Sequence, residues 1–220
     1  TYDNAIRNLL DFAKANPTGG IYGGRTFYPD GTLNPFSCLN QISVWSLVNR
    51  LLGLDKLISE SEFFNPEQIG GWKRDSVRNV DIVVGCFFLI PTALWHELGG
   101  FDLKYFMYGE EADLCHRARR KGYAPLITPD ANIMHLVGAS TSLRSDKILL
   151  VAQARVTLIR DHWPKWKAPI GVFLMKMWVA SRFAISKAMS SVKPKGRLEL
   201  HDTWRRVWLE RRTWLAGYHR

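Results

Sequence analysis

The pattern of the sequence changes once, close to residue 143, and this change limits the folds that the chain can adopt. On the N-terminal side, short β-branched and aromatic runs alternate with helical patterns, as in layered α/β structures. On the C-terminal side, the spacing of apolar residues is helical throughout. We therefore predict an α/β structure at residues 1–142, followed by a helical extension at residues 143–220.

Apolar spacing, caps and breakers predict the individual elements. The run VDIVVGCFFLI, from Val80 to Ile90, is too short for a membrane span and predicts one buried strand. The segments APLITP and ANIMHLVG predict two more short strands, and the polar segment from Ser59 to Arg78 predicts a loop. Helices are expected at Asp3–Ala15, Ile42–Leu54, Thr92–Leu98 and Glu110–Lys121, and at about Asp146–Asp161, Ile170–Ser191 and Leu198–Leu215.

Charge is distributed unevenly along the chain, whose net charge is +10. Residues 1–142 hold 13 basic and 15 acidic side chains, whereas residues 143–220 hold 17 basic and 5 acidic ones, together with six of the nine tryptophans. Such an asymmetry predicts an anionic partner for the extension, either a membrane surface or a nucleic acid. The nearly neutral first 142 residues argue against nucleic acid.

Three cysteines, Cys38, Cys86 and Cys115, are scattered and odd in number. Their spacing matches neither a disulfide framework nor a zinc site, so we expect reduced thiols in the core of a cytoplasmic protein. The chain opens with TYDNAIRNLL, which has no signal peptide and reads as the middle of a helix. We therefore expect the native protein to extend upstream of Thr1.

The segment YFMYGEEADLC crowds three carboxylates into four positions at the start of a predicted helix. The helix macrodipole favours acidic residues there, by about 0.3–1 kcal/mol each, which accounts for one or two of them. Glu110 and Asp113 lie three apart and share a helix face, whereas Glu111 points elsewhere. Crowded carboxylates behind an aromatic segment also suit a general base or a cation site, so capping and function both stay open.

His135 lies near the end of the predicted strand ANIMHLVG. A single histidine on a strand is more often an ordinary core or surface residue than a ligand. A loop that placed it beside the acidic helix would favour a divalent metal site, because imidazole and carboxylates together suit such an ion. Arg117, four residues after Asp113 on the same helix face, predicts a structural ion pair with it.

A series of short motifs follows in order along this region: Gly85 with its apolar run, Gly99–Asp102, Tyr108–Arg117, Gly122–Tyr123, Pro129–Ala131 and His135–Ser140. Together they closely resemble the C-terminal half of the catalytic domain of family 2 glycosyltransferases, in particular bacterial rhamnosyltransferase-like members. The resemblance is strong from about Ile6 to Trp163 and loose beyond. It implies a partial GT-A fold, an α/β sandwich that binds a nucleotide sugar and a divalent cation.

The resemblance also implies roles for single residues. Enzymes of this family invert the anomeric carbon in one displacement, and their catalytic base falls on Glu111, where Glu replaces the more usual Asp. Asp113 stays open as an alternative base, and Glu110 would orient its neighbours. His135 matches a histidine that completes the metal shell in some members. The substrate-binding residues would be Asp102, which also suits a turn, with Gly85 and Tyr108.

One family motif does not occur in the sequence. Members hold the metal-bound diphosphate through an Asp-x-Asp motif that precedes this region, and the 220 residues contain no Asp-x-Asp. The resemblance therefore implies Mg²⁺ or Mn²⁺ with its main ligands upstream of Thr1, and a chain that is inactive alone. The implied partners are a nucleotide-sugar donor and a glycan or lipid-linked acceptor used in cell-surface polysaccharide synthesis.

The apolar segment APIGVFLMKMWVASRFAISKAMSSV is interrupted by Arg182 and two lysines, which disfavours a membrane-spanning helix. It predicts an interfacial helix with Phe173, Trp178 and Phe183 in the lipid, or an ordinary packed helix. We therefore expect a peripheral protein on the cytoplasmic face of the membrane. The alternatives are a non-catalytic membrane-binding module and, from the Trp and Arg residues of WRRVWLERRTWLAGYHR, a nucleic-acid-binding protein.

Overall fold

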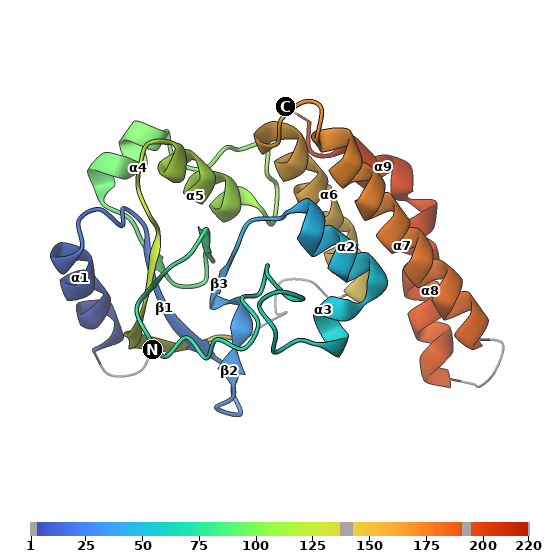
Figure 1. The fold of residues 1–220 in the computed structure, drawn as a ribbon, viewed down its shortest axis with the longest axis horizontal. Helices are drawn as coiled ribbons and strands as arrows, with labels where there is room; N and C mark the ends of the chain where they lie inside the picture. Colours follow the sequence, from blue (N-terminus) through green and yellow to red (C-terminus); the bar gives the residue numbers. More distant parts are fainter. Residues whose placement is uncertain (1–3, 137–142, 191–194, 220) are drawn as a thin grey trace. The chain divides into compact units, whose positions relative to one another are not determined.

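The computed structural model describes residues 4–136, 143–190 and 195–219, and it shows a mixed α/β structure (Figure 1). By its internal contacts the chain separates into two compact units. The described residues of 1–41, 58–103 and 110–137 form unit 1, and those of 42–57, 104–109 and 138–220 form unit 2. Two short segments of the first 142 residues thus belong with the helical extension, whereas the sequence predicted a single division at residue 142.

Unit 1 is built on a five-stranded mixed sheet. β1 (Tyr22–Phe27) and β7 (Leu126–Met134) form its central parallel pair. The shorter strands β2 (Leu33–Asn34), β4 (Arg78–Asn79) and β6 (Phe88–Leu89) join this pair antiparallel. A separate two-stranded ladder is formed by β3 (Cys38–Leu39), which follows the 3₁₀ helix η1 (Pro35–Ser37), and β5 (Ile82–Val83).

Helices cover both faces of the central strands. α1 (Ala5–Ala15) packs on one face through Leu9, which joins Tyr22 and Ala131 in a buried cluster. α5 (Glu110–Arg120) lies on the other side, where it packs against β5 and where Leu114 joins a second cluster that includes Ile127. Side chains alternate between the two faces of a strand, so β7 contributes Leu126 to the first cluster and Ile127 to the second. The start of α5 is thereby held over one face of the sheet.

The run from Val80 to Ile90 does not form the single buried strand that its composition predicted. It contains β5 and β6, separated by a turn in which the amide of Phe87 donates to the carbonyl of Val84 at 3.4 Å. The turn includes Gly85, and it sends the two halves to different partners, β5 to β3 and β6 to β1. The single-strand prediction was therefore wrong, because the apolar character of the run conceals the turn inside it.

The last strand of unit 1 also differs from its prediction. APLITP and ANIMHLVG contribute to one strand, β7, rather than to two. Its parallel register with β1 shifts between Ile127 and Asn132, where Pro129 has no amide hydrogen for the ladder. Gly23 and Arg25 point to the same face of β1, so their partners Ile127 and Asn132 share that face too. Asn132 therefore faces the side of the sheet that α5 covers.

The predicted helices of the first part are confirmed within a few residues. They are α1, α2 (Val44–Leu52), α4 (Thr92–Leu98) and α5. Gly53, with a φ of 80°, ends α2 in the left-handed region that glycine adopts without steric cost, and the single turn α3 (Leu54–Leu57) follows it. The segment from Ser59 to Val77 consists of turns and irregular backbone, as the sequence predicted.

Unit 2 is helical. α6 (Arg144–His162), α7 (Ala168–Ser190), α8 (Lys195–Leu209) and α9 (Arg211–Ala216) lie side by side with α2 (Figure 1). Their shared core includes Leu47, Ile159, Met175, Val207 and Trp214, all almost completely buried. The helical extension is thus confirmed, with the difference that the predicted last helix is divided at Glu210 into α8 and α9.

Two aromatic residues of α7 do not lie where the interfacial-helix prediction placed them. Trp178 packs edge-on against Trp204, and Phe183 stacks on Trp208 with ring centroids 6.3 Å apart. The prediction that Trp178 and Phe183 enter lipid was therefore wrong. Trp214 is fully buried as well. The tryptophans of the basic segment serve the core of unit 2, which argues against the open stacking platform that single-stranded nucleic acids use.

α7 has the length and composition of a helix that could cross a membrane, with 23 residues and a mean hydropathy of 1.3 over its most apolar 18-residue window. The core helix of a soluble protein can share these properties. Met175 and Val179 of α7 are fully buried against the neighbouring helices, and 22% of the window is buried overall. One side of α7 therefore belongs to the core of unit 2, and most of the remaining surface is accessible.

Candidate active site

The first turn of α5 holds the three carboxylates that the sequence singled out. The two residues that lead into it, Tyr108 and Gly109, have φ values of 67° and 94°. A residue other than glycine in this left-handed region is uncommon and costs about 1–3 kcal/mol, and such backbone concentrates at functional sites. The helix therefore begins from a constrained turn, which fixes the directions in which Glu110, Glu111 and Asp113 point.

Asp113 serves the architecture of unit 1. It is 3% exposed, its carboxylate accepts a hydrogen bond from Nε of Arg117 at 2.8 Å, and Nη2 of Arg117 completes an ion pair with the same oxygen at 2.8 Å. The same guanidinium donates to the carbonyls of Leu98 and Gly100, at the end of α4. The ion pair predicted from the spacing is thus present, and it ties α5 to the turn after α4. This pairing commits the Asp113 carboxylate to the fold, so Glu111 is the stronger candidate for the base.

Glu111 lies against the turn between β5 and β6. A methyl group added to Gly85 would stand 3.9 Å from the Cβ of Glu111, an ordinary contact distance. Burial raises the pKa of the Cys86 thiol to about 11, and the negative charge of Glu111 adds to this shift. Glu111 and Cys86 are therefore close enough to interact electrostatically, and the thiol stays neutral. Gly85 itself is exposed, so a substrate can reach this turn.

Two polar residues that the sequence analysis missed lie on the α5 face of the sheet. Arg25 and Asn132 are register partners on β1 and β7. Gly23 pairs with Phe88 of β6 in antiparallel register, and Arg25 lies two residues further along β1, in the direction of the turn that precedes β6. Arg25 and Asn132 therefore lie at the same end of the sheet as the turn that contacts Glu111. The one available signal in the sequence was a charged residue inside the apolar strand IYGGRTF.

Buried polar atoms without hydrogen-bond partners occur on the elements that form this region. Among the described residues they include Arg25 Nε, Asn132 Oδ1, Glu110 Oε2 and His135 Nδ1. A buried polar group left unsatisfied costs roughly 1–3 kcal/mol, so these atoms are ones that water or a ligand would be expected to bind. A guanidinium can donate hydrogen bonds to an anion, and an amide and a carboxylate can hydrogen-bond with hydroxyl groups.

His135 lies directly after β7, where its amide donates to the carbonyl of Phe27 at 2.9 Å. Its partnerless Nδ1 could bind a cation. Within residues 4–136, 143–190 and 195–219, however, no three His, Cys, Asp or Glu side chains lie close enough together to hold one ion. Mg²⁺ and Mn²⁺ need several oxygen ligands, so a single imidazole is not a site for them. The described residues do not by themselves fit the predicted cation.

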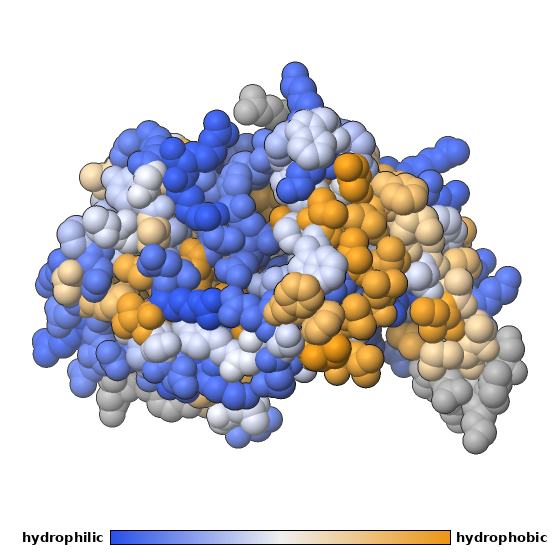
Figure 2. Space-filling view, in the orientation of Figure 1, coloured by the Kyte–Doolittle hydropathy of each residue, from blue (hydrophilic) through white to orange (hydrophobic). Residues whose placement is uncertain are grey.

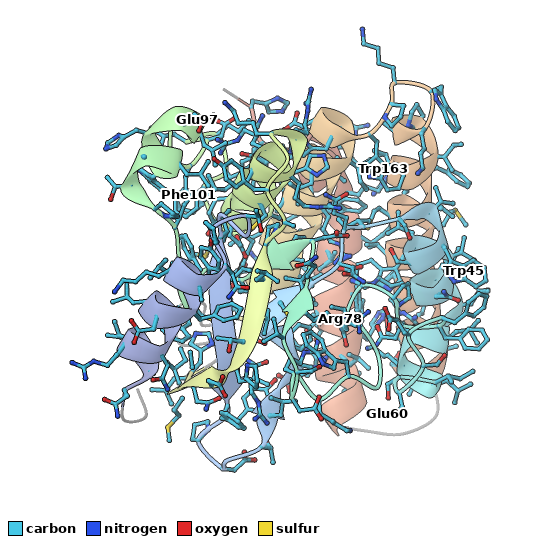
Figure 3. All side chains as sticks on the ribbon, turned by 60° about the vertical axis from the view of Figure 1, so that its left-hand side comes forward. Trp45, Glu60, Arg78, Glu97, Phe101 and Trp163 are labelled. Carbon is cyan, nitrogen blue, oxygen red and sulfur yellow. The ribbon has the colours of Figure 1, made fainter. Side chains whose placement is uncertain are left out.

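The other residues predicted to contact substrate are Asp102 and Tyr108. Asp102 is half-buried in the loop between α4 and α5, after a turn in which Phe101 (Figure 3) meets Trp95 edge-on with ring centroids 5.0 Å apart. Tyr108 belongs to unit 2, in a segment anchored where the Tyr218 hydroxyl donates to the Met107 carbonyl at 2.6 Å. The end of the predicted His-x-x-Gly-x-Ser motif, at residues 138–140, lies outside the described residues.

Comparison with known proteins shows similarity to part of the length of two curated proteins. No family model matches the sequence. Over 170 residues, or 76% of this chain, the sequence is 28% identical to proteins of two Mycobacterium tuberculosis strains named N-acetylglucosaminyl-diphospho-decaprenol L-rhamnosyltransferase. The chain spans about half the length of these relatives, 54%. The similarity supports a relationship between this chain and the glycosyltransferases.

Proposed function

We propose that the protein containing this chain is an inverting, family 2 glycosyltransferase with a GT-A fold. It transfers a sugar, L-rhamnose in the first instance, from a nucleotide sugar to a glycan or lipid-linked acceptor. The observation that carries the proposal is the position of Glu111, at the start of α5 and against the exposed Gly85 turn. The sequence similarity to a rhamnosyltransferase supports it. The activity is proposed for the whole protein, of which this chain supplies the base.

In this proposal Glu111 acts as the general base. The oxygen of the acceptor hydroxyl attacks the anomeric carbon of the donor, and the hydroxyl proton passes to the Glu111 carboxylate. The bond between the anomeric carbon and the diphosphate breaks, the diphosphate leaves with the electron pair, and the configuration at carbon inverts. A positioned base contributes about 10²–10⁴-fold to the rate of such a step. Asp113, paired with Arg117, fixes the helix that carries the base.

Arg25 and Asn132 supply polar groups on the same face of the sheet. We infer that the guanidinium meets charge that develops on the departing diphosphate, and that the amide meets a sugar hydroxyl. Gly85, Asp102 and Tyr108 stay predicted substrate contacts. His135 stays our proposed ligand for a divalent cation, together with groups that the described residues do not include, and no step above is routed through that ion.

The name of the relatives indicates a chemical class of acceptor, an N-acetylglucosaminyl-diphospho-polyprenol. Such a lipid is anchored in a bilayer, so we place the protein at the cytoplasmic face of the membrane, as a peripheral protein. The similarity to a rhamnosyltransferase, together with the position of Glu111, supports this catalytic function over a non-catalytic membrane-binding module.

The proposal is tested by a transfer assay with the native full-length protein, nucleotide-activated L-rhamnose and an N-acetylglucosaminyl-diphospho-polyprenol. We expect product to form, and we expect Glu111→Gln to lower kcat by at least about 10²-fold with a smaller change in KM. Glu97→Gln is the matched control, because Glu97 is exposed on α4 in an ion pair with Lys121 (Figure 3). Unchanged turnover of Glu111→Gln would remove the base assignment. Absence of transfer by the wild-type protein from several nucleotide sugars would favour the non-catalytic module.

A further inference from the structure

An exposed apolar stripe runs along α7 of unit 2. Ile170, Phe173 and Met177 are 44%, 58% and 39% exposed, and their spacing of three and four residues puts them on one helix face. Trp166, just before the helix, is 74% exposed. Figure 2 shows hydrophobic surface over α2 and the neighbouring part of α7. Aligned aromatic and aliphatic side chains of this kind mark a contact surface for a partner or a membrane.

A groove of about 610 Å³ adjoins the stripe. Its lining residues are all apolar or basic, and the basic ones are Arg160, Lys165 and Lys176. Phe173 lines the groove and also belongs to the stripe, so the two surfaces are continuous. We refer to the exposed part of both as the α7 face, defined by Trp166, Ile170, Phe173, Met177, Lys165 and Lys176.

The basic residues around α7 divide into two groups. Arg182 serves the fold, because its guanidinium donates to the carbonyl of Arg50, in the last turn of α2, at 2.8 Å. The Lys167 ammonium lies over the ring of Trp163, 4.8 Å from its centroid. Lys165 and Lys176, in contrast, are exposed beside the apolar stripe. Of the basic residues near the stripe, Lys165 and Lys176 therefore remain available to an external partner.

We propose that the α7 face docks on the surface of an anionic bilayer. The four apolar side chains enter the interface, and Lys165 and Lys176 contact lipid phosphates. Charge complementarity selects this occupant, because the groove contains cations and apolar groups only, within a C-terminal region of 17 basic and 5 acidic residues. Met175 and Val179 lie about half a turn from the stripe and are buried in the core. The helix therefore lies along the membrane rather than across it.

The first experiment measures co-sedimentation of the native full-length protein with phosphatidylcholine vesicles, with and without phosphatidylglycerol. We expect binding that requires the anionic lipid and weakens as salt is added. Lys165→Glu/Lys176→Glu should weaken it by at least about 10-fold. The matched control, Arg205→Glu/Arg212→Glu, makes the same charge change at exposed positions of α8 and α9 outside the groove, and it should retain binding. Equal binding by the two double variants would overturn the proposal.

A second pair of variants tests the apolar stripe. Phe173→Ser/Met177→Ser should lose binding, whereas Leu209→Ser, at a position of α8 that is 56% exposed, should not. Both should keep the thermal unfolding midpoint of the wild type, since the replaced side chains are exposed. Three results would each overturn the proposal. They are equal binding to neutral and anionic vesicles, displacement of bound vesicles by a DNA duplex, and a wild-type dimer that is lost in the Phe173→Ser/Met177→Ser variant. Neither vesicle experiment measures sugar transfer. Failure of the membrane proposal can therefore be distinguished from failure of the proposed function.

Discussion

Arg117 holds Asp113 from one helical turn away, with Nε and Nη2 each 2.8 Å from the same carboxylate oxygen. Asp113→Asn would remove the charge from this pair and leave the guanidinium without its counterion. We expect the free energy of unfolding to fall by about 2–3 kcal/mol in urea denaturation. This is less than the cost of breaking a fully buried pair, because the Arg117 side chain is 26% exposed.

Glu111→Gln provides the comparison for that variant. It changes a charge near the start of α5 without breaking the Asp113–Arg117 pair, so the free energy of unfolding should stay within about 1 kcal/mol of the wild type. The two variants then separate structure from chemistry, with stability lost in one and sugar transfer lost in the other. The opposite pattern would move the catalytic base to Asp113.

Arg25 is expected to matter for activity more than for stability. Its Nε has no hydrogen-bond partner to lose, and its contact over the Phe27 ring, 5.0 Å from the centroid, contributes about 0.5–1 kcal/mol. Arg25→Met should therefore keep the free energy of unfolding within about 1 kcal/mol while lowering kcat/KM for sugar transfer by at least about 10-fold. Arg7→Met, at an exposed position of α1, is the control. An Arg25→Met enzyme with normal transfer kinetics would show that Arg25 contacts no substrate.

Features encoded by neighbouring residues were predicted from the sequence, and features that depend on distant ones were not. α5 was predicted because glycines bracket it, at Gly109 and Gly122, with acidic residues in its first turn and basic ones in its last. The meeting of Arg25 and Asn132 depends on the register of two parallel strands more than a hundred residues apart in the sequence. No local pattern contains that register, so this part of the site became visible only in the fold.

The same distinction explains the errors on α7. An aromatic residue on an amphipathic helix suits both a lipid surface and a protein core, so Trp178 and Phe183 could not be assigned without their partners. Those partners, Trp204 and Trp208, lie on α8. Phe173 was also predicted to face outward, and it is exposed.

The buried thiols should react slowly in the native protein. Burial raises the pKa of Cys86 to about 11 and that of Cys115 to about 12, and the charge of Glu111 adds to both shifts. Only the thiolate is a strong nucleophile, so at pH 8 both should react with an aromatic disulfide reagent much more slowly than in urea. Cys86 should react first as the pH rises, because it is partly exposed whereas Cys115 is buried. Rapid labelling of the native protein at pH 8 would contradict these pKa directions.

The same shifts predict how stability depends on pH. The folded-state pKa values lie above the ordinary value of 9.0, so the native state holds these protons more tightly than the unfolded state does. Their contribution to stability is present below pH 9 and is lost as the pH rises towards 11–12. A Cys86→Ala/Cys115→Ala variant should therefore show a shallower fall in unfolding free energy between pH 9 and 11. Parallel curves for the variant and the wild type would show that the thiols do not contribute.

Gly85 is expected to keep the approach to Glu111 open. The φ angle of Gly85 is not positive, and a Cβ there would meet only the Glu111 Cβ, at 3.9 Å. The fold should therefore accept a side chain at this position. Gly85→Ala should keep most of the activity. Gly85→Val places two further methyl groups beside the carboxylate, and we expect kcat/KM for the acceptor to fall by at least about 10-fold with little change in the urea midpoint.

Gly23→Ala should show the opposite pattern, a loss of stability, and serves as the comparison. A Cβ on Gly23 would stand 2.5 Å from Val83 Cγ1 and 2.8 Å from Ile127 Cδ1, inside the packed core between β1 and α5. Overpacking of this kind costs about 1–3 kcal/mol, so this variant should lose stability. Normal acceptor kinetics in Gly85→Val would show that the acceptor reaches Glu111 from another side, and the Gly85 turn would then be a connection between β5 and β6 with no part in the site.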